Sequence, residues 1–158
     1  MKIRSSDISL IVYDFDGVFT NNQVLVLEDG REAVWCSRSD GWAIVQMRKQ
    51  GMRQIILSTE TNRVVRARAK KLGIEVRQSI ENKKDALNTL CNELGCDLKR
   101  VVYIGNDVND LDAMGVVGFP LAPCDAHEKI LALAKGVIPK KGGDGVIRYF
   151  WEQILDFS

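Results

Sequence analysis

Short, mostly apolar runs alternate with helical stretches along the chain, and this alternation constrains the fold more than any other feature. Apolar runs of this length are typical of strands buried in a parallel sheet. A repeated strand–helix–strand order predicts an α/β fold with a doubly wound, Rossmann-like parallel sheet. The predicted strands are residues 10–13, 54–57, 74–77 and 101–104, and the predicted helices are residues 41–50, 61–72, 83–94 and 108–114. Several of these helices are followed by a residue that ends a helix easily, namely Gly51, Gly73, Gly95 and Gly115.

One segment breaks the alternation and predicts a β-hairpin inserted directly after the first strand. Within residues 23–36, two apolar stretches flank Asp29-Gly30, which is a strong signal for a tight turn. The glycine-rich residues 142–145 allow a sharp turn near the end of the chain, and residues 146–157 then have a helical pattern. The chain shows no linker and has the length of one domain, so we expect a single domain over residues 1–158.

Composition and charge narrow the classes of function. The chain has 158 residues, of which 46% are hydrophobic and 27% charged, and its formal net charge is +1. Because it lacks a basic excess, we expect neither nucleic acid nor an anionic membrane surface as a partner. The apolar stretch at residues 8–13 is too short for a membrane span or a signal peptide, which predicts a cytoplasmic protein. The 4 cysteines form no CxxC pair, so we expect reduced thiols.

Carboxylates follow the first predicted strand, at the edge of the sheet where doubly wound folds bind ligands. Asp14 and Asp16 stand two positions apart there. Such a pair is costly to bury without a cation, and Mg²⁺ prefers oxygen ligands. A solvated Asp-x-Asp turn is the alternative interpretation of this pair alone.

The other strand ends carry polar residues as well. Ser58 and Thr59 place hydroxyls after the second strand, and Lys83 begins a helix, where a cation opposes the helix dipole unless it faces an anion. The last predicted strand is followed by residues 105–110, which concentrate four oxygen-bearing side chains in five positions. Each signal alone is explained by helix capping or solvation. Together, at one edge of the sheet, they predict a binding site.

The ordered set Asp14-Phe15-Asp16-Gly17, Ser58, Lys83 and residues 105–110 resembles the four motifs of the haloacid dehalogenase superfamily of phosphotransferases. The chain length, the Asp29-Gly30 hairpin, the segment at residues 38–41 and the late glycine-rich segment are similar to its capless, tetrameric branch. That branch contains 3-deoxy-octulosonate 8-phosphate phosphatases, nonulosonate 9-phosphate phosphatases and the phosphatase-like domain of CMP-acylneuraminate synthetases.

The resemblance implies a Mg²⁺-dependent phosphatase and assigns a role to each motif residue. Asp14 would be the nucleophile that becomes an aspartyl phosphate, and Asp16 the acid and base. Ser58 and Lys83 would bind the phosphoryl oxygens. The implied metal ligands are Asp14, Asp16 through its backbone carbonyl, Asn106, Asp107 and Asp110.

The resemblance also bears on the substrate. Glu60, Arg68 and Lys71 resemble the set with which nonulosonate 9-phosphate phosphatases hold their substrate, whereas octulosonate phosphatases usually have Arg in place of Glu60. With Thr59, these are the expected substrate-binding residues, and they favour a sialic-acid-type 9-phosphate over an octulosonate 8-phosphate. A solvated charged helix face is the alternative for Arg68 and Lys71, because several other cations lie on the same helix.

The family also forms homotetramers whose hairpins and tails cover neighbouring sites. Five residues would supply apolar surface for that contact, although core packing is the alternative for the tryptophans: Phe19, Val24, Val26, Trp35 and Trp42.

One departure from the family pattern keeps a second hypothesis open. Asn106 stands where the family often has Asp, and an amide lacks the charge that strengthens Mg²⁺ binding. The chain could then be a weakly active or inactive tetramerisation domain linked to CMP-acylneuraminate synthesis. We expect no nucleotide transfer by this chain, because a cytidylyltransferase domain does not fit within 158 residues.

Overall fold

A parallel six-stranded sheet forms the centre of the structure, which is a computed structural model that describes residues 1–158. The strand order is β6–β5–β2–β7–β8–β9, and every neighbouring pair is parallel. This order places β2, the first strand of the sheet, between β5 and β7. The strands are β2 (Leu10–Tyr13), β5 (Gln54–Leu57), β6 (Glu75–Arg77), β7 (Val101–Ile104), β8 (Phe119–Pro123) and β9 (Gly136–Ile138). The predicted doubly wound α/β sheet is confirmed.

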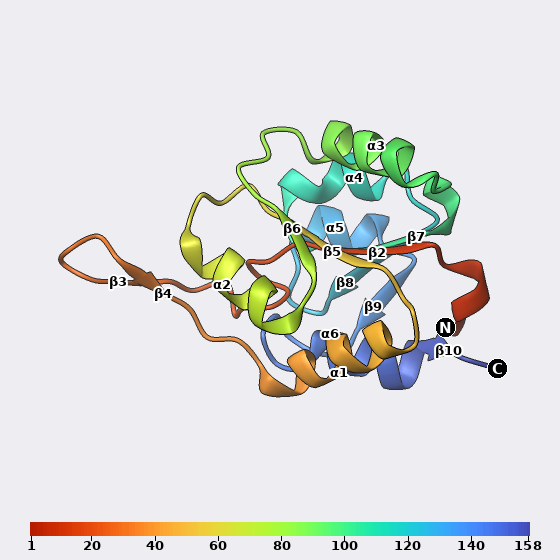
Figure 1. Cartoon of the computed structure of the whole chain (residues 1–158), viewed down its shortest axis with the longest axis horizontal. Helices are drawn as coiled ribbons and strands as arrows, with labels where there is room; N and C mark the ends of the chain where they lie inside the picture. The colour runs from red at the N-terminus through yellow and green to blue at the C-terminus, as the bar shows by residue number, and fades with distance from the viewer.

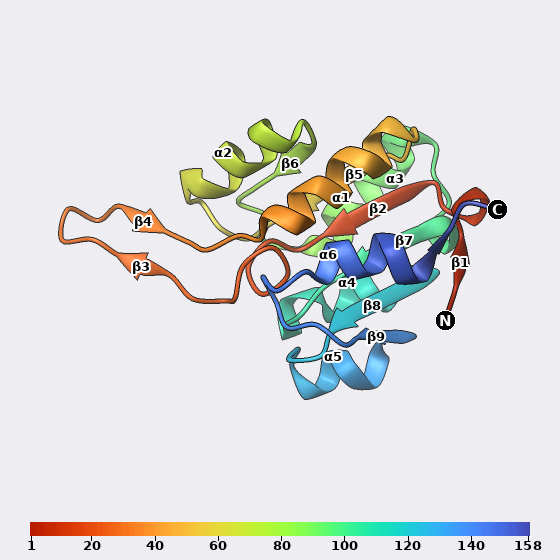
Figure 2. The same cartoon turned by 90° about the horizontal axis from the view of Figure 1, so that it is seen from below.

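Helices cover both faces of this sheet (Figures 1 and 2). Alternate strand side chains point to opposite faces, so Ile11 and Tyr13 join one apolar cluster while Leu10 and Val12 join the other. The first cluster is covered by α1 (Arg38–Lys49), α2 (Arg63–Leu72) and α6 (Val146–Tyr149), and the second by α3 (Lys83–Leu94), α4 (Leu111–Met114) and α5 (Glu128–Leu133). None of these helices has the length and apolar character needed to cross a membrane.

Side-chain caps set where the helices begin. The Ser37 hydroxyl accepts a hydrogen bond from the Asp40 N–H, so α1 begins at residue 38 and not at the predicted residue 41. Asn62 caps α2 in the same way, which moves its start from the predicted residue 61 to 63. The predicted range 83–94 agrees with α3, which Asn82 caps. In the predicted helix 108–114, the first turn is the 3₁₀ segment η3 (Val108–Asp110).

Two of the predicted glycine ends are left-handed caps. Gly73 ends α2 at φ 69° and Gly95 ends α3 at φ 64°. Gly51 lies one residue beyond the cap of α1 and is also left-handed. Gly115 is different, because its φ of −66° is right-handed, so its backbone conformation does not require glycine.

The inserted hairpin is confirmed and stands away from the sheet (Figures 1 and 2). Its strands β3 (Leu25–Val26) and β4 (Glu32–Ala33) pair antiparallel around Gly30, and a bridge between Thr20 and Cys36 closes its base. Apolar side chains on it are open to solvent, with Val26 61% and Trp35 78% exposed. The core alternative for the tryptophans is therefore wrong within one chain, since Trp42 is also 57% exposed. Phe19 is only 1% exposed and stacks on Phe15, so its predicted place on the apolar surface is wrong.

The strands β8 and β9 were not predicted. β8 contains two prolines, Pro120 and Pro123. Proline ordinarily argues against an interior strand because it has no backbone N–H to donate. The Pro120 carbonyl can still accept a hydrogen bond, and it does so from the Lys135 N–H at 2.8 Å. β9 is only 3 residues long, which is too short to show a period.

The C-terminal segment ends differently from the prediction. After α6 the chain makes the π-helical turn η4 (Phe150–Ile154), and then β10 (Leu155–Asp156) pairs in parallel with β1 (Ile3–Arg4). The predicted helix to residue 157 is therefore wrong at its end. Pairing with the N-terminal strand satisfies the backbone there, and no local pattern signals a partner so distant in sequence. The remaining 3₁₀ turns are η1 (Ser5–Asp7) and η2 (Leu98–Arg100).

Candidate active site

A polar cleft of about 150 Å³ lies where β2, β5 and β7 end. It brings together most of the predicted site residues, because the carboxyl ends of these parallel strands meet at one edge of the sheet. Its lining is Asp14, Asp16, Asn22, Ser58, Thr59, Glu60, Asn106, Asp107 and Asn109. Lys83 and Asp110 lie behind this lining and are buried.

Asp14 occupies the centre of the cleft floor. It directly follows the last residue of β2, and its side chain is nearly buried. One carboxylate oxygen, Oδ1, accepts from Lys83 Nζ at 2.7 Å and from the Phe15 N–H at 2.7 Å. Burial, followed by the nearby charge of Asp110, raises the pKa of Asp14 to about 7, although Lys83 opposes both effects. A carboxylate held like this keeps its second oxygen, Oδ2, free of the lysine.

Lys83 bridges two carboxylates below the cleft. Its Nζ lies 2.7 Å from Asp14 Oδ1 and 2.7 Å from Asp110 Oδ1. Burial by itself lowers the pKa of Lys83, but the two carboxylates outweigh burial and raise it above its ordinary value. The first residue of α3 therefore carries a permanent positive charge beside Asp14.

Asp110 is buried behind the cleft and holds other site residues. Its Oδ1 accepts from Lys83 and from the Tyr103 hydroxyl at 2.9 Å, while its Oδ2 accepts from the N–H groups of Asn106 at 3.0 Å and Asp107 at 3.3 Å. Both oxygens are thus engaged by donors, and the side chain is 0% exposed. This geometry favours a positioning role over the direct metal ligation that the motif implied.

Asp16 faces the cleft and is only partly buried. The Thr20 hydroxyl donates to its Oδ1 at 3.2 Å, and the same hydroxyl oxygen accepts from Gly17 N–H at 3.2 Å. Burial raises the pKa of Asp16, while the Thr20 hydrogen bond opposes the shift. A raised pKa suits a group that must donate a proton and take one back.

Ser58 and its neighbours form the wall contributed by β5. The Ser58 side chain is 1% exposed, and its Oγ accepts from Glu60 N–H at 3.1 Å, which leaves the hydroxyl proton available to a ligand. Thr59 and Glu60 are exposed at the mouth of the cleft. The hydroxyls therefore lie where the sequence predicted them.

Arg68 and Lys71 are not brought to the cleft within one chain. Arg68 donates from Nη2 to the Ser37 carbonyl at 2.9 Å, and its Nε is buried without a partner. Lys71 is exposed near the end of α2. Their role in substrate binding stays a prediction that one protomer alone does not fulfil.

The oxygen donors beside Asp14 fit a magnesium ion. No group of three or more His, Cys, Asp or Glu side chains is arranged to hold a metal ion. The donors that meet here are instead the Asp14 carboxylate, the Asp16 backbone carbonyl and the Asn106 amide. One atom of this amide lies 2.8 Å from the Asp16 carbonyl oxygen and 3.0 Å from Asp14 Oδ2. Hard oxygen donors of this kind suit Mg²⁺, which usually takes one or two carboxylates and keeps several waters. Asp107 stands at the rim, where its side chain caps Val108 N–H at 2.7 Å.

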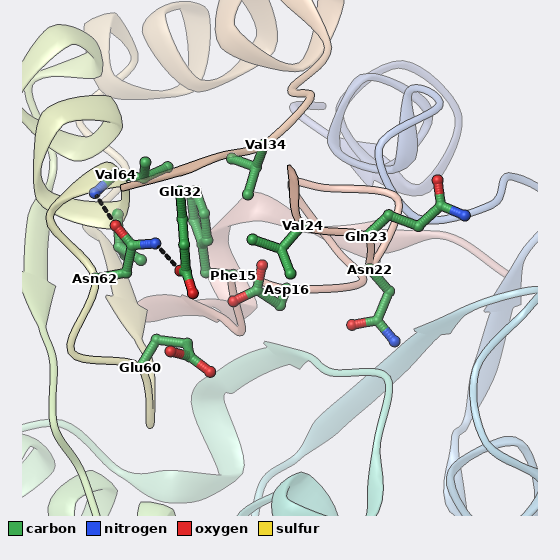
Figure 3. A pocket seen from close by; sticks show the side chains of 11 residues that line it. Phe15, Asp16, Asn22, Gln23, Val24, Glu32, Val34, Glu60, Asn62 and Val64 are labelled. Carbon is green, nitrogen blue, oxygen red and sulfur yellow. Dashed lines mark hydrogen bonds between the residues drawn. The ribbon is translucent and has the colours of Figure 1, made fainter. Parts of the chain in front are cut away.

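A second cavity of about 180 Å³ adjoins Asp16, between the hairpin and the start of α2 (Figure 3). Glu32 of β4 and Glu60 are directed into it, and Asn62 donates from Nδ2 to Glu32 (Figure 3). Phe15, Val24 and Val34 supply its apolar wall. The sequence did not predict Glu32 and Asn62 as site residues, since nothing in the local pattern shows that the hairpin lines a cavity beside Asp16.

Phosphoryl transfer needs a fixed nucleophile, cations and hydrogen-bond donors more than further covalent chemistry. The carboxyl edge of this α/β sheet supplies these groups, so fold and site together define a metal-assisted phosphoryl-transfer enzyme. The family model described as haloacid dehalogenase-like hydrolase matches residues 46–150, and the chain belongs to this family. It is a phosphoric monoester hydrolase that uses Mg²⁺.

Relatives and solved structures agree with this placement. The chain is 31% identical to the 3-deoxy-D-manno-octulosonate 8-phosphate phosphatase of Yersinia pestis, over 96% of this chain and 82% of that protein. It is 28% identical to the N-acylneuraminate cytidylyltransferase of Oncorhynchus mykiss over 94% of this chain, but it spans only 35% of that enzyme's length.

A structure from Streptomyces avermitilis, described only as a hydrolase of this family, superposes with a TM-score of 0.92 at 45% identity, covering 96% of this chain and 88% of that one. The octulosonate 8-phosphate phosphatase of Moraxella catarrhalis, solved with magnesium, phosphate and its sugar, has a TM-score of 0.89 at 30% identity, covering 92% and 84%.

Proposed function

We propose that this chain, as one phosphatase domain over residues 1–158, hydrolyses the phosphate ester of a sugar acid through an aspartyl phosphate on Asp14. The observation that carries the proposal is the placement of Asp14 at the cleft floor, 2.7 Å from the buried Lys83 ammonium and beside Asp16. A carboxylate next to a fixed cation can accept a phosphoryl group while the cation stabilises the charge that develops.

The cleft divides the chemistry between two carboxylates. Asp14 attacks phosphorus, the bond to the sugar oxygen breaks, and Asp16 gives that oxygen its proton. A water then attacks the phosphoryl group while Asp16 takes the water's proton, and Asp14 is released with inorganic phosphate. Ser58 and Lys83 donate to the phosphoryl oxygens throughout. The magnesium ion, held by Asp14, the Asp16 carbonyl and Asn106, would neutralise charge on the transferred group.

The cavity beside Asp16 is the place for the leaving sugar, and its acidic lining bears on the substrate. Glu32 and Glu60 accept hydrogen bonds from hydroxyl or amide groups, and they repel a carboxylate. Both candidate sugar acids carry the phosphate at the far end of the molecule from the carboxylate, so this lining is compatible with either. The preference for a nonulosonate 9-phosphate rests on Glu60, which stands where octulosonate phosphatases usually have Arg. The octulosonate 8-phosphate is the alternative, and the Yersinia pestis and Moraxella catarrhalis relatives favour it.

A carboxylate on the substrate needs a cation that one protomer does not place in this cavity. We propose that a homotetramer supplies it, with Arg68 and Lys71 of α2 as the donors from a neighbouring chain. Arginine suits this task because its planar fork binds both oxygens of a carboxylate. The exposed hairpin side chains are the apolar surface available for this assembly. A cytoplasmic location stays a prediction.

The test is phosphate release from nonulosonate 9-phosphate, octulosonate 8-phosphate and a simple hexose 6-phosphate, with Mg²⁺ or with EDTA. We expect metal-dependent release from a sugar-acid phosphate, and a loss of at least about a thousandfold in Asp14→Asn, because an amide is not a nucleophile here. Release that persists in Asp14→Asn would contradict the mechanism, and release from the hexose phosphate alone would contradict the substrate class.

Charge reversal at Glu60 tests the choice between the two sugar acids. We expect Glu60→Arg to raise the ratio of kcat/KM for the 8-phosphate over the 9-phosphate by roughly 10- to 150-fold, since one charged contact contributes about 1.5–3 kcal/mol. Glu81→Arg is the matched control, because Glu81 is exposed and lies outside both cavities. An unchanged ratio in Glu60→Arg would show that Glu60 does not select the sugar.

A second candidate function is a tetramerisation domain with little activity of its own. Asn106 favours it, because an amide ligand carries no charge, and so does the similarity to part of a cytidylyltransferase. Wild type that releases no phosphate from any substrate, while Asn106→Asp does, would support this candidate over the enzyme.

A further inference from the structure

The Asn106 side-chain amide faces two acceptor oxygens, the Asp16 backbone carbonyl and Asp14 Oδ2. One terminal atom of this amide lies 2.8 Å from the Asp16 carbonyl oxygen and 3.0 Å from Asp14 Oδ2. With Oδ1 in that place, three oxygens face one another without a donor. With Nδ2 in that place, the amide donates to both neighbours, so the hydrogen-bond network assigns the nitrogen inward in the metal-free chain.

The same two distances also fit a magnesium site. Oxygen ligands of Mg²⁺ lie at about 2.0–2.1 Å in an octahedron, so neighbouring ligands are about 2.9 Å apart. Distances of 2.8 and 3.0 Å are thus right both for N–H donation and for two oxygens sharing a cation. Turning the amide by 180° about its last torsion exchanges one state for the other without moving the backbone.

Burial keeps the amide in this position. Asn106 is 7% exposed. Its backbone N–H donates to Asp110 Oδ2 at 3.0 Å, and its backbone carbonyl accepts from the His127 N–H at 2.8 Å. A Cβ at Gly17 would come within 2.5 Å of the amide carbon, so the Gly17 backbone packs directly on the amide. The backbone on both sides therefore fixes where the amide lies and leaves its orientation as the free variable.

We propose that Asn106 is a two-state positioning residue: its NH₂ holds Asp14 and the Asp16 carbonyl together when the metal is absent, and its Oδ1 turns inward when Mg²⁺ binds. The inference rests on the metal site of the proposed function, but on no catalytic step. It gives the asparagine a purpose that an aspartate cannot serve, because a carboxylate has no proton with which to bridge the two oxygens.

The proposal predicts opposite effects of Asn106→Asp on stability and on metal affinity. Without metal, the new carboxylate faces Asp14 Oδ2 and the Asp16 carbonyl and repels both, so the metal-free variant is less stable. With metal, it adds a charged ligand, so we expect Mg²⁺ to bind on the order of tenfold more tightly. The same substitution should therefore lower the stability of the metal-free chain and raise its affinity for Mg²⁺.

The direct test is the side-chain NH₂ of Asn106 by NMR in ¹⁵N-labelled wild type, assigned from its loss in Asn106→Asp. In EDTA we expect slow hydrogen exchange of this NH₂, because both its neighbours are acceptors inside a buried site. Saturating Mg²⁺ should shift the resonance and speed its exchange. An NH₂ that exchanges fast in EDTA, or that is unchanged by Mg²⁺ whose binding calorimetry confirms, overturns the proposal.

The second test compares thermal unfolding in EDTA with calorimetric Mg²⁺ affinity. Asn106→Asp should unfold several degrees below wild type in EDTA, with the difference closing in saturating Mg²⁺. Asn92→Asp is the matched control: it is the same change at an exposed position of α3 outside both cavities, so neither quantity should move comparably. A metal-free Asn106→Asp as stable as wild type overturns the proposal, whereas one that folds only with Mg²⁺ supports it.

Neither measurement requires turnover. If the chain hydrolyses no sugar phosphate but shows these effects, the proposed function fails and the inference about Asn106 holds. If the chain hydrolyses the phosphate but the amide does not respond to Mg²⁺, the proposed function holds and the inference about Asn106 fails.

Discussion

The ion pairs of Lys83 organise the site at the scale of single residues. One ammonium lies 2.7 Å from each of two carboxylates, Asp14 and Asp110, and all three side chains are buried. Buried charges of this kind contribute little net stability as a set, but leaving one unpaired is costly. The set is therefore sensitive to the loss of any one member.

Lys83→Met should destabilise the chain by about 3–5 kcal/mol and abolish turnover, because it leaves two buried carboxylates without a counter-ion. The measurement is urea unfolding together with phosphate release. Lys84→Met is the matched control, since Lys84 is only half-buried and pairs with no carboxylate, and it should change stability by less than about 1 kcal/mol. The double variant Lys83→Met/Asp110→Asn should recover part of the loss, and a double variant less stable than Lys83→Met would contradict this account.

The site residues were predictable to different degrees. Asp14, Asp16, Ser58 and Lys83 follow strands or begin helices, so their approximate place follows from local pattern. Asp110 was expected among the metal ligands, yet it lies behind the cleft and holds Lys83 and Tyr103. A motif records spacing along the chain, whereas the direction of a side chain depends on what packs around it.

The C-terminal segment supports the site at the scale of elements. The turn before α6 packs on the loop that follows Asp16, where Gly143 N–H donates to the Val18 carbonyl at 3.0 Å. The carboxylate of Asp40 in α1 accepts a hydrogen bond from the Arg148 N–H of α6 at 2.8 Å, which ties the two helices together. The last helix thereby connects the hairpin side of the site to the core.

Gly142→Ala should displace the loop after Asp16. An added Cβ would lie 2.2 Å from the Gly17 carbonyl oxygen, which is backbone and cannot turn aside. We expect a loss of about 1–3 kcal/mol in the free energy of unfolding and a lower kcat, measured by urea unfolding and phosphate release. In Gly115→Ala the nearest atom lies 3.3 Å away, so this control should stay within about 0.5 kcal/mol of wild type. Equal effects of the two substitutions would contradict the steric explanation.

Asp40 should make stability depend on pH. Burial raises its pKa from 3.8 to about 6, against the opposing hydrogen bonds from the start of α6 and the charge of Arg68, and its Oδ2 is buried without a partner. Because the pKa is higher in the folded chain, the folded state binds the extra proton. This contribution is present below about pH 4 and is lost as pH rises through about 6.

Asp40→Asn removes the titration and keeps an acceptor for the Arg148 N–H. Relative to wild type, its free energy of unfolding should rise on the order of 2–3 kcal/mol between pH 4 and pH 7. Urea unfolding across this range measures the difference. Asp144→Asn, an exposed change in the neighbouring turn, should show no such trend. A difference between Asp40→Asn and wild type that stays constant with pH would contradict the assignment.

At the scale of the whole molecule, the hairpin carries apolar side chains that this chain does not cover. Leu25, Val26 and Trp35 are 59%, 61% and 78% exposed. Its residues Val24, Glu32 and Val34 also line the cavity beside Asp16 (Figure 3), so a contact that orders the hairpin would act on this cavity as well. This supports an assembly in which the site is complete only between chains.

Trp35→Ser should therefore weaken the proposed homotetramer and lower kcat/KM together, because the contact orders the hairpin over the cavity. Sedimentation velocity at micromolar concentration measures the assembly. Val137→Ser is the control, since Val137 is exposed apolar surface on the opposite edge strand, β9. If wild type is a monomer, or if Trp35→Ser changes neither quantity, the assembly proposal is wrong.

The sequence by itself determined the strands β2, β5, β6 and β7, most of the helices, the hairpin and the edge at which Asp14, Asp16 and Ser58 meet. Hydrophobic periodicity and caps are local, and the carboxyl ends of parallel strands share one edge wherever the strands lie in the sheet. Only the tertiary structure decided that Asp110 holds Lys83, that Glu32 reaches the cavity, that Arg68 turns to Ser37, and that β10 pairs with β1. These outcomes depend on contacts between segments that are distant in sequence. Local pattern does not determine which way such a side chain or strand edge faces, and packing and the hydrogen bonding of buried polar groups decide it.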